Sequence, residues 1–251
     1  MSNLPPSMPD FDFNTPVSTA NSLSSASPEF LAGLRSGLGL ILNGLLLVVA
    51  LLTLQMLLAM VAAALNEKPM LLQLGLQALM LGATGMTVVG YWKFSEADSA
   101  GNDDPAAASL RRLIRVPVVI QFVSGLAWLG TAIGLAYGLW STPGASPSAG
   151  VGIVYLVALF GTLAASVVAW IVQLIGVVLY VKWLGGRVPD AFIQRRASVY
   201  AWLLPLLQTV GICVVGLGPL IALVLYWNML DRLRKHVRAI QETGSPAILP
   251  A

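Results

Sequence analysis

The longest uncharged segment of the chain reads VPVVIQFVSGLAWLGTAIGLAYGLWSTPGASPSAGVGIVYLVALFGTLAASVVAWIVQLIGVVLYV, which is residues 116–181. Three more uncharged runs cover residues 36–66, 69–92 and 197–230. Only 10% of all residues are charged and 57% are hydrophobic, whereas a soluble domain carries charge at about a quarter of its positions. Because a charge placed in hydrocarbon costs several kcal/mol, this pattern predicts an integral membrane protein.

The same runs predict helices rather than barrel strands. A transmembrane barrel strand alternates polar and apolar residues over about ten positions, whereas these runs are continuously apolar and rich in Leu, Ala and Val. Helices pair their backbone groups internally, and about 20 residues cross the hydrocarbon core. We therefore predict an all-α membrane protein, a polytopic transmembrane helical bundle of about five spans. The expected spans are residues 36–65, 70–92, 116–140, 151–183 and 198–230.

The two ends of the chain differ from this transmembrane helical domain, which we expect over residues 35–238. Residues 1–34 are rich in Ser and Pro and predict a disordered tail, because such a segment cannot bury enough apolar surface to fold. Residues 239–251 predict a short flexible tail. The single cysteine, Cys213, lies in an apolar run, so no disulfide can form within the chain.

The last apolar run, residues 197–230, allows two interpretations. One kinked span accounts for its length, and this is the interpretation we adopt. The alternative is a re-entrant or split run that gives six segments, with a turn at the GLGP sequence of residues 216–219. Against the alternative, a return leg over residues 217–230 measures only about 21 Å at 1.5 Å per residue, short of a hydrocarbon core of about 30 Å.

Basic residues indicate the orientation. The polar loops 93–115 and 182–196 carry eight basic residues, whereas the loop 141–150 carries none. Under the positive-inside rule the two polar loops lie in the cytoplasm, and the expected location is a cell or inner membrane. Under the single-span interpretation the basic segment that follows the last run, residues 231–238, lies on the opposite face of the membrane from these loops. If the run turns back, the segment is cytoplasmic and would attract anionic lipid. The candidate lipid-headgroup contacts in this segment are Arg232, Arg234, Lys235 and Arg238.

Small residues predict where two of the spans pack most tightly. The third and fourth expected spans carry small side chains at four-residue spacing, which lets two helix backbones approach closely. A short loop joins these spans, so we expect an antiparallel hairpin. The predicted helix-packing residues are Gly130, Gly134, Gly138, Gly161, Ala165 and Ala169.

Amide side chains recur inside the uncharged runs, which contain no Asp, Glu, His, Lys or Arg. Buried amides in lipid usually bond across helices, although they could instead line a polar path. Without ionisable groups in the runs, we predict no catalytic, cofactor-binding or metal site and no cofactor. His236, in the basic segment, is expected to be solvated. The amides are Asn43, Gln55, Gln73, Gln77, Gln121, Gln173 and Gln208.

A weak repeat relates two parts of the chain. The sequence YWKF at residues 91–94 precedes one polar loop, and YVKW at residues 180–183 precedes the other. A duplicated helical hairpin would produce this similarity, and so would aromatic and basic residues acquired independently at two cytoplasmic loops.

These observations predict a non-enzymatic integral membrane protein with a scaffolding, assembly or accessory-subunit role. The alternative is a small-solute or lipid transporter built on the duplicated hairpin. The expected partners are the lipid bilayer and other membrane protein subunits; nucleic acid is not expected, because the basic residues flank the spans. Polar side chains converging on one cavity would favour transport, and polar contacts scattered between helices would favour the scaffold.

Overall fold

The computed structural model describes residues 22–65, 70–98, 105–141, 149–188, 190–214 and 218–246. In this part the chain forms six α-helices and no strand, which confirms the prediction of an all-α helical bundle. A short 3-10 helix, η2 (Leu23–Ser25), precedes them. The helices are α1 (Pro28–Leu65), α2 (Met70–Phe94), α3 (Pro105–Ser141), α4 (Ala149–Gly186), α5 (Ala191–Val214) and α6 (Gly218–Thr243).

Four described segments are long and apolar enough to cross a membrane: Pro28–Leu65, Leu71–Phe94, Pro105–Thr131 and Phe160–Gly186. They belong to the first four helices and overlap the first four predicted spans. The helices also extend into polar sequence: α3 has 37 residues and is about 55 Å long at 1.5 Å per residue. A helix of this length that crosses a hydrocarbon core of about 30 Å projects well beyond it.

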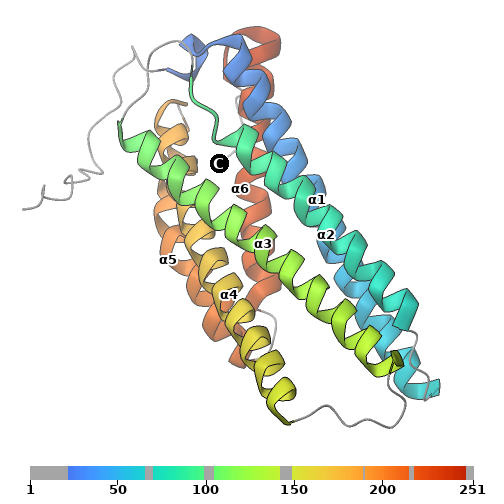
Figure 1. Ribbon diagram of the computed structural model, residues 1–251. Coiled ribbons are helices and arrows are strands. Elements are labelled where there is room, and N and C mark those ends of the chain that lie inside the picture. The colour runs from blue at the N-terminus through green and yellow to red at the C-terminus, as the bar shows by residue number, and fades with distance from the viewer. Residues whose placement is uncertain are drawn as a thin grey trace, which may run out of the picture.

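Each helix packs against its neighbours in the chain, and α6 returns to pack against α1, so the helices form a closed ring. Successive helices run in opposite directions (Figure 1). The starts of α1, α3 and α5 and the ends of α2, α4 and α6 therefore lie together, at the upper end in Figure 1. Toward the opposite end the helices diverge, most visibly α3 from α4.

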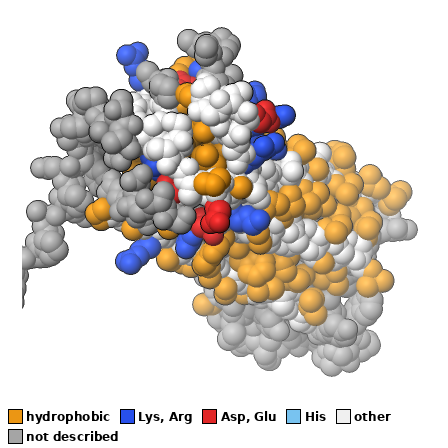
Figure 2. Space-filling view, turned by 90° about the horizontal axis from the view of Figure 1, so that it is seen from above, with side chains coloured by type: hydrophobic (Ala, Val, Ile, Leu, Met, Phe, Trp, Pro, Cys, Tyr) orange, Lys and Arg blue, Asp and Glu red, His pale blue; other side chains and the backbone are white. Residues whose placement is uncertain are grey.

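All charged side chains of the described residues belong to this upper end, which we call the head. Figure 2 looks onto the head and shows basic and acidic side chains around it, with the hydrophobic surface of the helices extending beyond. The interior of the head is an apolar core to which all six helices contribute fully buried side chains. The head consists of residues 22–38, 91–98, 105–118, 180–188, 190–200 and 226–246.

Away from the head, large apolar side chains face outward. Leu46, Met56 and Met60 of α1 are 60%, 70% and 69% exposed, and Val168 of α4 is 61% exposed. A soluble protein rarely leaves so extensive an apolar surface in contact with water. Hydrocarbon is the solvent that suits this surface, in agreement with the membrane-spanning length of the helices.

The last apolar run forms two helices, so the prediction of one kinked span at 198–230 is wrong and the alternative of a split run is confirmed. α5 and α6 pack against each other. Pro219 lies in the first turn of α6, where its missing N–H would be unpaired in any case. Ala222 and Tyr226 of α6 are buried within the protein, whereas Leu220, Ile221 and Val224 face outward. Packing of the buried face against α5 and α1 holds this short return leg in the bundle.

As a result, the basic segment 231–238 lies in the head, beside the start of α1. The Nη1 atom of Arg35 donates a hydrogen bond to Oε1 of Gln241 at 3.1 Å. The single-span interpretation had placed this segment on the opposite face. α6 continues to Thr243, so the first residues of the predicted flexible tail 239–251 are helical.

The predicted disordered tail, residues 1–34, extends too far into the chain. α1 already begins at Pro28, and Leu23 and Leu34 are buried in the core of the head. These two large apolar side chains are enough to bury part of the segment in the core, although its overall Ser-rich composition predicted disorder. Residues 1–21, the rest of the predicted tail, lie outside the described residues.

The tightest helix contact lies between α1 and α2. A Cβ atom at Gly37 would lie 2.5 Å from the backbone N of Phe94, and one at Gly90 would lie 2.8 Å from the backbone N of Ile41. Only glycine allows two backbones to meet so closely. The predicted packing stripe did not include these glycines.

The antiparallel hairpin of α3 and α4 is present, but its closest contact is not at the predicted stripe. Among the described residues, nothing lies within 4 Å of the Cβ position at Gly130 or at Gly161. The close approach is nearer the head, at Gly176, where a Cβ would lie 2.9 Å from the carbonyl oxygen of Leu113. The helices cross there and diverge beyond it (Figure 1), so four-residue spacing alone did not locate the contact.

The other four stripe residues have mixed surroundings. Ala165 is exposed, Gly134 is half-buried, and Ala169 is buried with an exposed fraction of 5%. The surroundings of Gly138 lie outside what the structure describes. Among the stripe residues whose surroundings the structure describes, Ala169 is therefore the one that the protein interior covers.

Three hairpins make up the ring, and the second helix of each contains a tyrosine within a similar apolar sequence. VVGYWKF (88–94) ends α2, VVLYVKW (177–183) lies near the end of α4, and LVLYWNM (223–229) lies within α6. Their three tyrosines are buried, and the hydroxyls of Tyr91 and Tyr226 lie 2.9 Å apart. The position of this sequence differs between the hairpins. It begins five residues after the start of α6, whereas it lies near the ends of α2 and α4.

Candidate anion-binding site between α5 and α6

Asp190 joins the start of α5 to the C-terminal half of α6. Its Oδ1 atom accepts a hydrogen bond from the N–H of Phe192 at 3.0 Å and so caps the helix, where backbone donors otherwise lack partners. Its Oδ2 atom accepts one from Nε of Arg232 at 2.9 Å and lies 2.7 Å from Nε2 of His236. One carboxylate thus holds two side chains that are one helical turn apart on α6.

His236 is buried, contrary to the prediction of a solvated imidazole. Its exposed fraction is 2%, and it lies on the face of α6 that also buries Leu233, Val237 and Ile240. These positions are three or four residues apart and therefore share one side of the helix. The sequence prediction considered the basic composition of the segment and did not identify this apolar face.

Asp190 is ionised at neutral pH. Burial raises the pKa of its carboxyl, but the hydrogen bonds with Arg232, His236 and the Phe192 N–H, together with the charge of Arg232, outweigh burial. The net pKa lies below the ordinary value for Asp. The bridge between α5 and α6 is therefore anchored by a negative charge.

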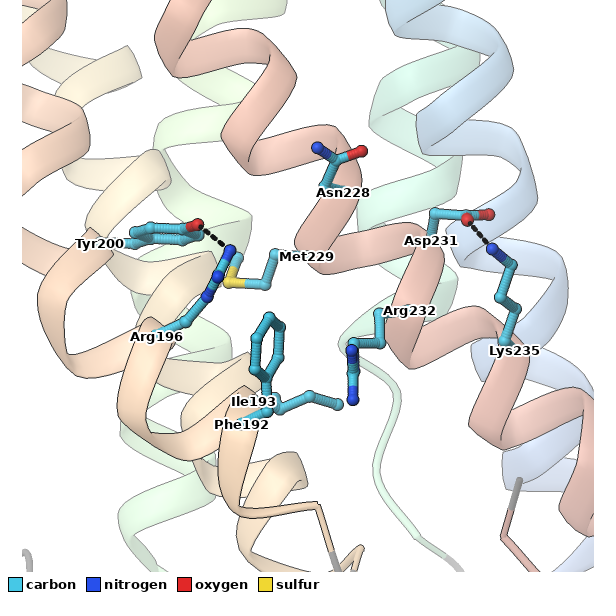
Figure 3. A pocket seen from close by; sticks show the side chains of 9 residues that line it. All are labelled: Phe192, Ile193, Arg196, Tyr200, Asn228, Met229, Asp231, Arg232 and Lys235. Carbon is cyan, nitrogen blue, oxygen red and sulfur yellow. Dashed lines mark hydrogen bonds and ion pairs between the residues drawn. The ribbon is translucent and has the colours of Figure 1, made fainter. Parts of the chain in front are cut away.

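A pocket of about 340 Å³ lies beside this bridge. Figure 3 shows the side chains that line it, with those of α5 and α6 facing one another. Each helix contributes a stripe of side chains at spacings of roughly one turn. The lining residues are Phe192, Ile193, Arg196 and Tyr200 from α5 and Asn228, Met229, Asp231, Arg232 and Lys235 from α6.

Two guanidinium groups share one aromatic ring in this pocket. The Cζ atoms of Arg196 and Arg232 each lie 4.0 Å from the centroid of the Phe192 ring. Arg196 also donates from Nη1 to the hydroxyl of Tyr200 at 3.3 Å, and Arg232 is held by Asp190. These contacts fix both cations in place. A planar guanidinium can bind two oxygen atoms of a phosphate or carboxylate at once, so the pocket is suited to an anion.

The structure brings two of the four predicted lipid-headgroup residues into the pocket. Arg232 and Lys235 line it. Arg234 lies on the side that faces α1. Arg238 forms an exposed ion pair with Glu242, with Nε and Oε1 2.8 Å apart. Only two of the four residues share a surface, so the four together do not form one binding site.

The residues that α5 contributes to the pocket were not predicted from the sequence. Phe192, Arg196 and Tyr200 follow one another at four-residue spacing, which was a readable signal of one helix face. Their partners on α6 could not be paired with them while residues 197–230 were interpreted as one span. The hairpin of α5 and α6 was needed to place the two stripes opposite each other.

Several buried polar side chains away from the pocket bond to one another across helices. Gln121 of α3 donates to Gln173 of α4, and the Gln173 side chain also interacts with the hydroxyl of Tyr91 on α2. Tyr91 in turn bonds to Tyr226 of α6. This polar chain connects four of the six helices and uses two of the predicted amides.

Three other predicted amides gather in one place. Gln55, Gln73 and Gln77 line a pocket of about 300 Å³ between α1 and α2, together with Met, Leu and Ala side chains. We call this pocket the amide groove. The Oε1 atom of Gln77 is buried there and has no hydrogen-bond partner among the described residues. The groove lies outside the head, in the part of α1 and α2 whose other side chains are apolar.

In the part of the chain that the structure describes, no group of three His, Cys, Asp or Glu side chains could hold a metal ion. Comparison of the chain with protein-family models, with curated proteins and with solved structures finds no match.

Proposed function

We propose that this protein is a multi-pass integral membrane protein with a scaffolding, assembly or accessory-subunit role and no enzymatic chemistry of its own. The observation that carries the proposal is the polar chain from Gln121 through Gln173 and Tyr91 to Tyr226. These side chains satisfy one another and tie α2, α3, α4 and α6 together. Polar groups that bond to one another in this way hold helices in a fixed arrangement, and their donors and acceptors are not available to a substrate.

The head supports the same role. Its core draws on all six helices, and the ion pair of Asp98 with Arg187 is buried inside it. A head of this kind presents a fixed charged surface beside the membrane, which suits the binding of another subunit in one orientation. We place the head in the cytoplasm of a cell or inner membrane, because it contains every described Lys and Arg residue.

Purification in mild detergent from the native membrane tests the proposal. We expect the protein, 26.5 kDa as a single chain, to elute with a partner protein at a constant molar ratio through two successive columns. A covalent cross-linker applied to intact membranes should capture the same partner. Elution as a single chain from membranes in which cross-linking also captures nothing would contradict the accessory-subunit role.

The amide groove favours the second candidate, a small-solute or lipid transporter. Gln55, Gln73 and Gln77 converge there, and Gln77 contributes an unpaired buried acceptor. Transport would require purified protein in vesicles to move a polar solute or a labelled lipid across the bilayer. A rate that falls in Gln77→Leu and persists in Gln121→Leu, whose amide belongs to the polar chain, would favour transport over the scaffold.

A further inference from the structure

We infer that the pocket between α5 and α6 binds the phosphate group of an anionic phospholipid. The inference rests on the membrane location in the proposed function, and it adds a ligand and a site. Arg196 is the last charged residue of α5 before its apolar run, and Asp231 and Arg232 are the first charged residues of α6 after its own. The pocket therefore straddles the boundary between charged and apolar surface, where lipid headgroups meet a membrane protein.

Aromatic side chains mark the same depth. Trp202, two residues beyond the pocket residue Tyr200 on α5, is 61% exposed. Trp227 precedes the pocket residue Asn228 on α6 and is half-buried. Trp and Tyr collect at the level of the headgroups, because their rings prefer the apolar side and their polar atoms prefer water. A lipid phosphate at this depth reaches the pocket without leaving the leaflet.

The chemistry of the pocket suits a phosphate diester. Arg196 and Arg232 are held against the Phe192 ring at 4.0 Å before any ligand arrives. Because these side chains are already held in place, binding costs little side-chain entropy, which favours affinity. Asp190 forms a hydrogen bond with Arg232 and contacts His236 but shows no contact with Arg196. Two guanidiniums around one ring thus leave positive charge that a phosphate oxygen can balance.

The acidic residue of the pocket limits the charge of the ligand. Asp231 lines the pocket and pairs with Lys235 on the next turn of α6, their Oδ2 and Nζ atoms 2.7 Å apart. Its carboxylate repels additional negative charge, so a headgroup with a single phosphate diester fits better than a multiply phosphorylated one. The volume of about 340 Å³ is within the range of small-ligand pockets.

Native mass spectrometry of the purified protein tests the inference. Protein in a non-ionic detergent is mixed with equal amounts of phosphatidylglycerol and phosphatidylcholine, and the retained lipids are counted. Three variants are compared with wild type: Arg196→Gln, Phe192→Leu and Arg195→Gln. Arg195 is the matched control, because it is exposed on the same helix at the same depth but does not line the pocket. Inorganic phosphate at millimolar concentration, with thermal stability as the readout, distinguishes a lipid phosphate from a soluble one.

We expect wild type to retain phosphatidylglycerol in preference to phosphatidylcholine. Arg196→Gln should reduce that retention about five- to tenfold, Phe192→Leu should reduce it less, and Arg195→Gln should leave it nearly unchanged. Phosphatidylglycerol, but not inorganic phosphate, should raise the unfolding temperature. Equal loss in Arg196→Gln and Arg195→Gln would overturn the pocket, and equal stabilisation by inorganic phosphate would overturn the lipid assignment. Because the purified protein is used, absence of a partner subunit does not affect the result.

Discussion

The carboxylate of Asp98 and the guanidinium of Arg187 form a buried ion pair in the head, with Oδ2 and Nη2 3.5 Å apart and side chains 2% and 4% exposed. Asp98 follows α2 and Arg187 follows α4, so the pair joins two polar loops. The two residues are 89 positions apart, the same separation as Tyr91 and Tyr180 of the repeat. The pair thus links equivalent points of two hairpins. Asp98 also accepts a hydrogen bond from the N–H of Ser27 at 3.3 Å, which connects the segment before α1.

Removing one partner of this buried pair should destabilise the head strongly. Asp98→Ala leaves the Arg187 charge buried without its carboxylate, which typically costs about 3–5 kcal/mol. Asp231→Ala, which breaks the more exposed pair with Lys235, should have a far smaller effect. Chemical unfolding of the detergent-purified proteins, followed by circular dichroism, measures the difference. Equal losses of stability in the two variants would show that burial of the Asp98 pair has no special importance.

Acid should weaken the head through Asp190. Its pKa is lowered in the folded protein, so its ionised form favours folding. This contribution is fully present above the ordinary Asp pKa of about 3.9 and is lost as the pH falls through the lowered folded-state pKa. Asp190→Asn should therefore be less stable than wild type at neutral pH, and the gap in unfolding temperature should narrow below about pH 4. A gap that stays constant into the acid range would argue against an ionised Asp190 as the link.

The contact of α1 with α2 should not tolerate a Cβ atom. In Gly37→Ala the new methyl would overlap the backbone of Phe94, so the helices must separate, at a cost of about 1–3 kcal/mol. Gly130→Ala meets nothing within 4 Å and should be neutral or slightly stabilising, because alanine favours helix over glycine. Unfolding temperatures of the two variants in one detergent decide the matter. If Gly130→Ala is the more damaging change, the predicted α3–α4 stripe packs against something after all.

The charged head should lie on one side of the membrane together with the C-terminus. The contact of Arg35 with Gln241 brings the end of α6 beside the start of α1. A fluorescent protein fused after Ala251 should therefore fluoresce in the cytoplasm, and alkaline phosphatase fused there should be inactive. In a Cys213→Ser background, an impermeant thiol reagent added outside should label a cysteine at position 146 and not one at position 99. Labelling at 99 alone would place the head outside.

Much of the fold could be predicted from the chain because lipid imposes a simple rule on sequence. A charge is costly in hydrocarbon, so Arg35, Lys93 and Arg115 mark where the apolar parts of the first three helices begin or end. The helices α1 and α3 themselves begin earlier, at Pro28 and Pro105. Backbone groups in lipid must pair internally, so each long apolar run had to be helical. Expecting Gln121 and Gln173 to bond across helices followed from the same constraint, and the structure shows that bond.

The pocket could not be predicted, because it depends on how two distant segments meet. The stripe of Phe192 and Arg196 and the stripe of Asn228 and Arg232 are each readable as a helix face. Whether they face each other depends on the turn between α5 and α6. Length favoured one span, since 14 residues do not cross a bilayer alone. In the structure α6 packs against α5 and α1 through one face, where Ala222 and Tyr226 are buried. No local pattern in the chain records that packing.

By itself, then, the sequence determined the helical class and the membrane setting, since both follow from transfer of side chains between water and hydrocarbon. Tertiary structure alone decided which residues touch. The crossing of α1 and α2 made Gly37 and Gly90 the close contacts instead of Gly130 and Gly161. The return of α6 buried His236 and placed Arg232 beside Phe192. Helix packing depends on the shapes of the side chains on both helices and on the angle at which the helices cross. The periodicity of a single helix predicts neither of these.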